Sequence, residues 1–224
     1  MRAPFVDRRD AGRALAGKLR RYAGLPDVLV LGLPRGGVPV AYEVATALGA
    51  PLDVFVVRKL GVPGHEEIAF GAIASGGVRV LDSSVVAQLR ISDAMIERVT
   101  QMERSELEQR EALYRPERRF SDVEGRTVIL VDDGIATGAS MYAAVLALRQ
   151  ERPARIIVAA PAGSADGIRA LSAVADACVC VVTPPLFHAV GMWYLDFEQT
   201  TNKEVRDLLR DARARTAEAA GRAT

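Results

Sequence analysis

The sequence predicts an α/β fold built on a doubly wound, mainly parallel sheet. Short apolar runs of strand length alternate along the chain with longer segments in which apolar residues recur at helical spacing. The apolar runs contain few polar residues, as expected for parallel strands that are covered on both faces. Turns containing glycine or proline separate the two kinds of segment. Strands that alternate with helices are typical of a parallel sheet flanked by helices, and this pattern predicts the fold class.

Each element is predicted from its own stretch of sequence. Five apolar runs predict strands at 27–33, 52–57, 128–131, 155–160 and 177–182, and a short sixth strand is predicted at 78–81. Helical spacing predicts helices at 10–22, 39–48, 92–114, 141–148, 166–174 and from 200 toward the end. The glycine-rich segment 61–77 has no clean period, and we expect a long loop or a loose hairpin there.

The composition is that of an ordinary globular protein. Half of the 224 residues are hydrophobic and the net charge is +1, so the chain has no general attraction for nucleic acid or anionic membranes. No apolar run approaches the roughly 20 residues that span a bilayer, and the N-terminus lacks the apolar segment of a signal peptide. Cys178 and Cys180 lie in an apolar run and suit small core residues. We therefore expect a cytoplasmic protein without nucleic-acid or membrane partners.

The most informative stretch runs from Val128 to Ser140 and reads VILVDDGIATGAS. A buried strand ends in two carboxylates, Asp132 and Asp133, and a turn with glycine and hydroxyl residues then leads into a helix. The first N–H groups of a helix are unpaired and its dipole favours negative charge, so this turn can bind a phosphate. The two acids suit hydroxyl groups, Mg²⁺ or a developing positive charge. The stretch therefore predicts a sugar-phosphate site.

Two further strand ends carry residues suited to anions. Arg35, Gly36 and Gly37 follow the first strand, where glycines allow a close approach of the backbone and arginine can pair with a phosphate. Arg58 and Lys59 close the second strand, where they are either anion ligands or simply solvated charges; Lys59 is the stronger candidate. Because ligands bind outside the carboxyl ends of parallel strands, we expect these residues near the acid pair.

The stretch 128–140 resembles the phosphoribosyl-pyrophosphate (PRPP) loop of type I phosphoribosyltransferases in the spacing of its acid pair, Thr-Gly and small hydroxyl residue. The resemblance implies the type I fold in a single domain. Its core would span about 26–183, and a small hood would come from about 1–25 and 184–200. A C-terminal helix and tail would occupy 201–224. The family also has a mobile loop that closes over the site, here expected between residues 61 and 77.

The resemblance also implies an activity, which is transfer of the 5-phosphoribosyl group from PRPP to a nitrogenous base with release of pyrophosphate, as in nucleotide salvage. Asp132 and Asp133 would hold the ribose hydroxyls and the Mg²⁺ cofactor and, with Lys59, act in catalysis. The 5′-phosphate would be bound by Ile135, Ala136, Thr137, Gly138, Ala139 and Ser140, and the pyrophosphate by Arg35, Gly36, Gly37 and Arg58. A cis peptide is expected at Pro34–Arg35 or Arg35–Gly36, and a homodimer would be usual for the family.

The acceptor base is left open by the sequence. Four aromatic residues lie between positions 187 and 197, of which Phe187 and Trp193 are the candidates for contact with a base, although packing of the hood explains such residues equally well. Ala136 stands where transferases for 6-oxopurines usually carry an aspartate, which puts hypoxanthine and guanine in doubt. Purines, pyrimidines and non-nucleobase amines all remain candidate acceptors.

The alternative function is a non-catalytic regulator that keeps this fold and senses PRPP. A basic run in the first helix supports it, but a solvated helix face explains that run as well; its members are Arg8, Arg9, Arg13, Lys18, Arg20 and Arg21. A second basic group ends the long charged helix; its members are Arg110, Arg115, Arg118 and Arg119. These residues either belong to a subunit interface and reach the pyrophosphate site of a neighbouring subunit or, as we expect for most of them, form a solvated surface.

Overall fold

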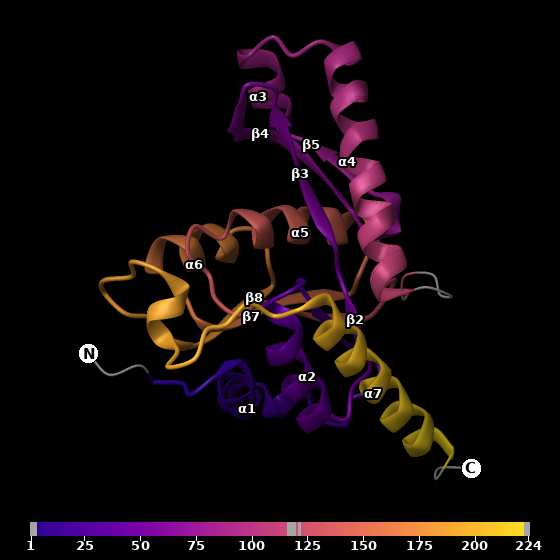
Figure 1. Ribbon diagram of the computed structural model, residues 1–224, viewed down its shortest axis with the longest axis vertical. Helices are drawn as coiled ribbons and strands as arrows, with labels where there is room; N and C mark the ends of the chain where they lie inside the picture. The colour runs from indigo at the N-terminus through magenta and orange to yellow at the C-terminus, as the bar shows by residue number, and fades with distance from the viewer. Residues whose placement is uncertain (1–3, 116–119, 121, 222–224) are drawn as a thin grey trace.

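The computed structural model describes residues 4–115, 120 and 122–221, and its core is a five-stranded parallel sheet (Figure 1). The strands lie in the order β2–β1–β6–β7–β8, and they are β1 (Val28–Gly32), β2 (Leu52–Val54), β6 (Thr127–Val131), β7 (Arg155–Ala162) and β8 (Ala177–Val182). The order reverses between β1 and β6, so the sheet is doubly wound, as predicted. All five long apolar runs therefore form strands of this sheet.

Helices cover both faces of the sheet (Figure 1). One face carries α1 (Arg8–Lys18), which continues into the short η1 (Arg20–Tyr22), and α2 (Gly37–Leu48); the other carries α5 (Ala139–Gln150) and α6 (Ala165–Ser172). Successive residues of β1 alternate between the two cores, with Val28 and Val30 in one and Leu29 and Leu31 in the other. The last helix, α7 (Asn202–Gly221), packs against α2. Cys178 and Cys180 are free and pack against one and the same core, as expected for small core residues.

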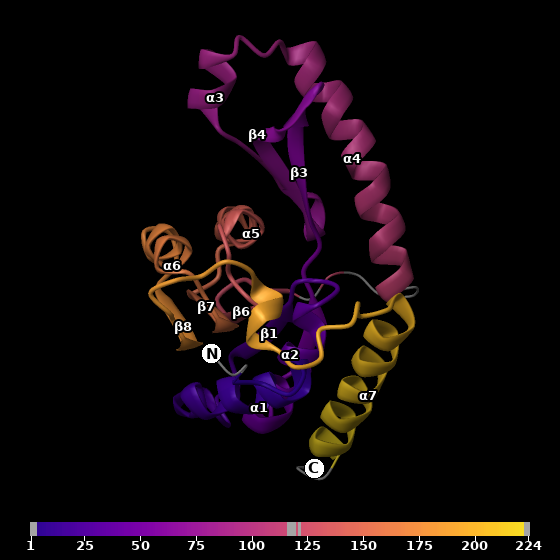
Figure 2. The same ribbon diagram turned by 60° about the vertical axis from the view of Figure 1, so that its left-hand side comes forward.

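Residues 57–114 leave the core and form a projecting unit, which we call the arm (Figure 2). Its three antiparallel strands are β3 (Val57–Val62), β4 (His65–Ala74) and β5 (Arg79–Leu81); its helices are α3 (Ser83–Gln88) and α4 (Asp93–Tyr114), with η2 (Ser75–Gly77) between β4 and β5. The expected long loop at 61–77 is wrong, because most of that segment belongs to paired strands. The hairpin alternative is closer, and register shifts around Gly61 explain the missing period.

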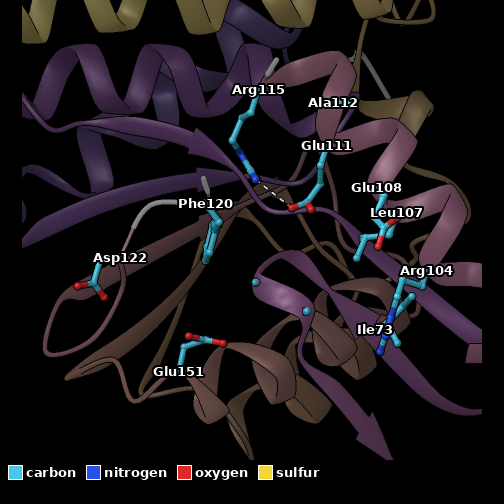
Figure 3. Close-up of a pocket in the computed structure, with 12 residues that line it drawn as sticks. Ile73, Arg104, Leu107, Glu108, Glu111, Ala112, Arg115, Phe120, Asp122 and Glu151 are labelled. Atoms are coloured by element: carbon cyan, nitrogen blue, oxygen red, sulfur yellow. Dashed lines mark hydrogen bonds and ion pairs between the residues drawn. The ribbon is translucent and has the colours of Figure 1, made fainter. Parts of the chain in front are cut away.

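The base of the arm is tied to the core by Arg115, one of the four arginines for which the sequence predicts a mostly solvated surface. Arg115 is an exception to that expectation, since it is 6% exposed. Its Nε lies 3.0 Å from Asp53 Oδ1, and its Nη2 donates to the Val54 carbonyl at 2.7 Å and to Ser75 Oγ at 3.1 Å. Nη1 pairs with Glu111 at 2.9 Å, beside a cavity of about 710 Å³ (Figure 3). Arg118 and Arg119 lie outside the described residues.

These contacts explain why the second strand is shorter than its apolar run. The Val54 carbonyl accepts from Arg115, and the Val56 N–H donates to Ser75 Oγ at 3.0 Å. These backbone groups bond to side chains at the base of the arm. The Phe55 N–H makes a last bond to the sheet, donating to the Gly32 carbonyl at 3.0 Å. The chain then leaves the parallel sheet and enters β3 at Val57.

The terminal segments predicted to form the hood pair with each other. The Phe5 N–H donates to the Trp193 carbonyl at 3.2 Å, and the Phe5 carbonyl accepts from Leu195 N–H at 2.9 Å. Phe5 and Tyr194 are buried, and their ring centroids lie 5.7 Å apart. The short helix η3 (Val190–Trp193) belongs to this unit. Within the described part of the chain, no helix combines the length and apolar character that crossing a membrane requires.

Candidate active site

The loops that follow β1 and β6 meet at the carboxyl edge of the sheet. A Cβ atom on Gly36 would lie 2.7 Å from Asp133 Cγ and closer still to its Oδ2. A Cβ atom on Gly37 would lie 2.6 Å from the Val131 carbonyl oxygen and 2.9 Å from Asp132 Cα. Only glycine leaves room for these approaches. The structure therefore brings together two loops that are about a hundred residues apart in the sequence, as predicted.

Arg35 stands at the entrance to this contact. The peptide bond that precedes it, Pro34–Arg35, is cis and is the first of the two positions expected. The Arg35 side chain is half-buried and lies close enough to Tyr114 that its charge opposes the rise that burial causes in the pKa of the tyrosine. The charge of Arg35 therefore acts on the end of α4 from the glycine loop.

The acid pair lies in a poorly solvated position. Burial raises the pKa of Asp132 well above its usual value, and the neighbouring charge of Asp133 raises it further. Burial also raises the pKa of Asp133, although its hydrogen bond to Arg8 acts in the opposite direction. The Asp133 N–H donates to Asp132 Oδ1 at 2.8 Å. Two acids held this close together favour binding of a cation or of hydroxyl donors.

Arg8 is a site residue that the sequence analysis assigned to a solvated helix face, and that assignment is wrong. Its Nε lies 2.8 Å from Asp133 Oδ2, and its side chain is 11% exposed. Its Nη1 donates to the Glu198 carbonyl at 2.6 Å, and its guanidinium carbon lies 3.9 Å from the centre of the Phe197 ring. Tyr194 also reaches the acid pair, since its hydroxyl donates to the Asp133 carbonyl at 2.5 Å. The hood thus supplies the counter-charge of the acid pair.

The predicted phosphate loop, residues 135–140, forms the start of α5. Gly138 precedes the helix with a φ of 76°, a conformation that favours glycine, and the Ala139 N–H donates to Thr137 Oγ1 at 3.4 Å. The loop lines a cavity of about 180 Å³ together with Lys59, Asp132 and Val190. The Ile135 side chain is buried in the core and is 1% exposed. Its N–H donates to the Ala162 carbonyl at 2.9 Å and its carbonyl accepts from Ser164 N–H at 2.8 Å, so the structure does not support Ile135 as a phosphate ligand.

The two basic residues of β3 point in opposite directions. Lys59 is exposed and lines the loop cavity. Arg58 pairs instead with Glu103 of α4, with 2.7 Å between Nε and Oε2. This separation follows from the alternation of side chains along a strand. The structure therefore brings Lys59, but not Arg58, to the acid pair and the phosphate loop.

The two candidate base-binding residues, Phe187 and Trp193, stack on each other. Their ring centroids lie 6.1 Å apart and the planes are inclined by 17°. Trp193 also packs against the small hood core of Phe5 and Tyr194. Neither residue is part of the lining of the loop cavity. The sequence identified the aromatic cluster, while the spacing alone gave no signal that these two rings would contact each other.

Asparagine in place of Asp132 is expected to raise the thermal stability of the protein at pH 8. A raised pKa means that the folded state binds more protons than the unfolded chain, so the aspartate destabilises the fold as the pH rises above about 4. Asparagine removes that penalty and keeps an oxygen for the Asp133 N–H. Melting temperatures measured from pH 3 to pH 8 should separate as the pH rises. Asp166→Asn, on a side chain that is 89% exposed, is the control; equal melting curves at pH 8 would contradict the prediction.

Among the described residues, no three His, Cys, Asp or Glu side chains gather closely enough to form a metal site by themselves. The acid pair nevertheless offers carboxylate oxygens, which are the ligands that Mg²⁺ prefers. The remaining ligands of such an ion would have to come from the bound substrate and from water. The donor set therefore fits an ion that arrives together with an anionic sugar phosphate.

Comparison with known proteins shows the family of the chain. Residues 7–193 match the family model described as "Phosphoribosyl transferase domain". Two Mycobacterium tuberculosis proteins, from strains H37Rv and CDC 1551 / Oshkosh and each provisionally named a phosphoribosyl transferase, are 47% identical over 215 residues, which cover 96% of this chain and 48% of theirs. The chain thus spans about half the length of these relatives. The crystal structure of TT1426 from Thermus thermophilus superposes with a TM-score of 0.84 at 45% identity, covering 94% of this chain and 99% of that one. The chain therefore belongs to the phosphoribosyl transferase family.

Proposed function

We propose that the chain transfers the 5-phosphoribosyl group of PRPP to a nitrogenous acceptor and releases pyrophosphate. The observation that carries the proposal is the meeting of three features at one sheet edge, namely the acid pair, the phosphate loop of α5 and the glycine loop after β1. Each suits a different part of PRPP. We extend the proposal to a role in nucleotide salvage and to a homodimer, both on the grounds of family membership alone.

The parts of PRPP are assigned by chemistry. Backbone N–H groups of residues 136–140 bind the 5′-phosphate at the start of α5, since the N–H of Ile135 is already bonded to the Ala162 carbonyl. Asp132 and Asp133 hold the ribose hydroxyls. Arg35, Gly36 and Gly37 receive the pyrophosphate, while Lys59 neutralises its charge from the arm side. Arg58 joins them only if its ion pair with Glu103 opens. A Mg²⁺ ion held between the acid pair and the substrate would offset the negative charge of the leaving pyrophosphate.

Catalysis then rests on position and charge. The acceptor nitrogen attacks the anomeric carbon as the bond from that carbon to the pyrophosphate oxygen breaks, and positive charge develops on the ribose ring. Asp133 lies where a carboxylate can stabilise that charge, and the reaction requires no strong nucleophile or base from the protein. The departing pyrophosphate keeps its electrons and is held by Arg35 and Lys59.

Titration with PRPP tests the proposal. Calorimetry should show saturable binding that Mg²⁺ strengthens and that falls by more than about 100-fold in Asp132→Asn/Asp133→Asn, because the interactions with the ribose and the metal are both lost. The control Asp166→Asn should bind as the wild type does. Absence of binding at millimolar PRPP would refute the proposal. Pyrophosphate release with any acceptor separates the enzyme from a PRPP-sensing regulator, which binds PRPP without turnover, and Asp133→Asn should lower that release by more than about 100-fold.

A further inference from the structure

A second cavity of about 520 Å³ adjoins the phosphate loop on the side of the arm, and we call it the arm slot. Strands β4 and β5 form one of its walls and the first turns of α5 form another. Figure 1 shows α5 lying directly beneath these strands. Lys59, Thr137 and Ala139 line both the arm slot and the loop cavity. The two cavities are therefore neighbours, and one ligand or two ligands in contact can fill them together.

The walls of the arm slot are apolar and small. Alanine or glycine occupies six of the fourteen lining positions, which leaves space between β4 and α5; these residues are Ala69, Gly71, Ala72, Ala139, Ala143 and Ala170. Tyr142 is the aromatic residue of the lining and is 39% exposed, so one part of its ring surface is open. An aromatic face beside small apolar side chains suits a flat ring.

The polar groups of the arm slot are few. Lys59 and Thr137 stand where the slot meets the loop cavity. Asp82 caps α3 through Oδ1, which accepts from the Ser84 hydroxyl at 2.5 Å, from Val85 N–H at 3.1 Å and from Ser84 N–H at 3.0 Å. The Ser84 hydroxyl, followed by the Val85 N–H, holds the pKa of Asp82 below its usual value. Ser83 also lines the slot, so the polar groups on this wall lie at the start of α3.

We propose that the arm slot binds a flat heteroaromatic ring of the substrate. The inference rests on the proposed function, since it places the ring beside a bound phosphoribosyl group. The volume lies within the range typical of small-molecule sites, and the walls match the ring in shape and polarity. The ring is either the free acceptor base or a base joined to the ligand through its phosphate, because the slot opens at the phosphate loop. It replaces Phe187 and Trp193 as the base contact, since those rings already stack on each other.

A matched pair of tryptophan variants tests the arm slot. Ala170 and Ala165 are both exposed residues of α6, but only Ala170 lines the slot. Binding is measured by saturation-transfer NMR with adenine, guanine, hypoxanthine, uracil and orotate, each in the presence of PRPP, and with ADP-ribose alone. At least one probe should saturate the wild type. Ala170→Trp should lower the binding affinity of that probe by 10-fold or more. Ala165→Trp and Phe187→Ala should leave this affinity unchanged.

The remaining outcomes are equally decisive. The proposal that the arm slot binds a ring is overturned if no probe binds the wild type. It is also overturned if binding survives in Ala170→Trp and is lost in Phe187→Ala. A free base as the responding probe identifies the acceptor, whereas ADP-ribose identifies a ring carried on the phosphate. Calorimetry with PRPP on the same samples separates the two proposals. If PRPP binds and no ring probe binds, only the proposed role of the arm slot is refuted. If a ring probe binds and PRPP does not, only the proposed function is refuted.

Discussion

Alanine in place of Gly36 is expected to weaken PRPP binding by at least about 100-fold while the protein stays folded. The new Cβ would lie 2.7 Å from Asp133 Cγ and 3.3 Å from Arg8 Nε. Either the glycine loop or the Asp133 carboxylate must therefore move by roughly an ångström. Displacements of that size at a reacting centre lower the reaction rate by about 100-fold, and we expect a loss of similar size in the affinity for PRPP. The sheet beneath the loop is untouched, so circular dichroism should stay the same. Calorimetry with PRPP and Mg²⁺ measures the loss.

The control is the same substitution at a glycine with free space around it. Gly17 lies in α1, and a Cβ there would meet nothing within 4 Å. Gly17→Ala should leave PRPP binding unchanged and stabilise the protein by up to about 1 kcal/mol, the difference in helix propensity between the two residues. Wild-type affinity in Gly36→Ala would mean that the ligand does not use the contact between the two loops.

Methionine in place of Arg115 is expected to lower the free energy of unfolding by about 3–5 kcal/mol, the usual cost of breaking a buried ion pair from one side. Asp53 is 5% exposed and would lose its guanidinium partner, and the Val54 carbonyl and Ser75 Oγ would each lose a donor. Urea denaturation followed by tryptophan fluorescence measures the change. The substitution leaves the acid pair and the phosphate loop unchanged.

Arg110→Met is the matched control, because Arg110 lies on the same helix and is exposed. Its effect should stay within about 0.5 kcal/mol, as for most surface substitutions. Limited proteolysis adds a local readout, since loosening of the base should make the arm the first region to be cut in Arg115→Met. Equal unfolding free energies for the two variants would show that the buried network contributes nothing to stability.

The parallel sheet could be predicted because its central strands are buried. Runs such as 128–131 and 156–160 are apolar on both faces, and this local property is visible in the sequence. The acid pair and the phosphate loop could be predicted for a similar reason, because their residues are contiguous at a strand end. The close contact of Gly36 with Asp133 followed from the rule that parallel strands present their ends at one edge.

Features that depend on distant partners could not be predicted. Arg8 lies 125 positions from Asp133, and Arg115 lies 62 positions from Asp53, so each resembles a solvated charge in its own sequence context. The arm was missed because its strands are short or irregular and carry several glycines. The mutual stacking of Phe187 and Trp193 depends on the path of the hood, which spacing along the chain does not specify.

The Arg115 network allows the amino-acid sequence of the arm to vary without loss of the core. It joins the end of β2, the turn at Ser75 and the end of α4, so both chain ends of the arm are fixed at one place. The entropy of closing a loop grows only slowly with its length, by about 0.6 kcal/mol for each doubling. Insertions or substitutions within the arm therefore change the free energy of unfolding of the core only slightly. Under the proposed function, this arrangement separates an exchangeable arm from a constant sheet edge, so that the acceptor could change while the residues at that edge stay the same.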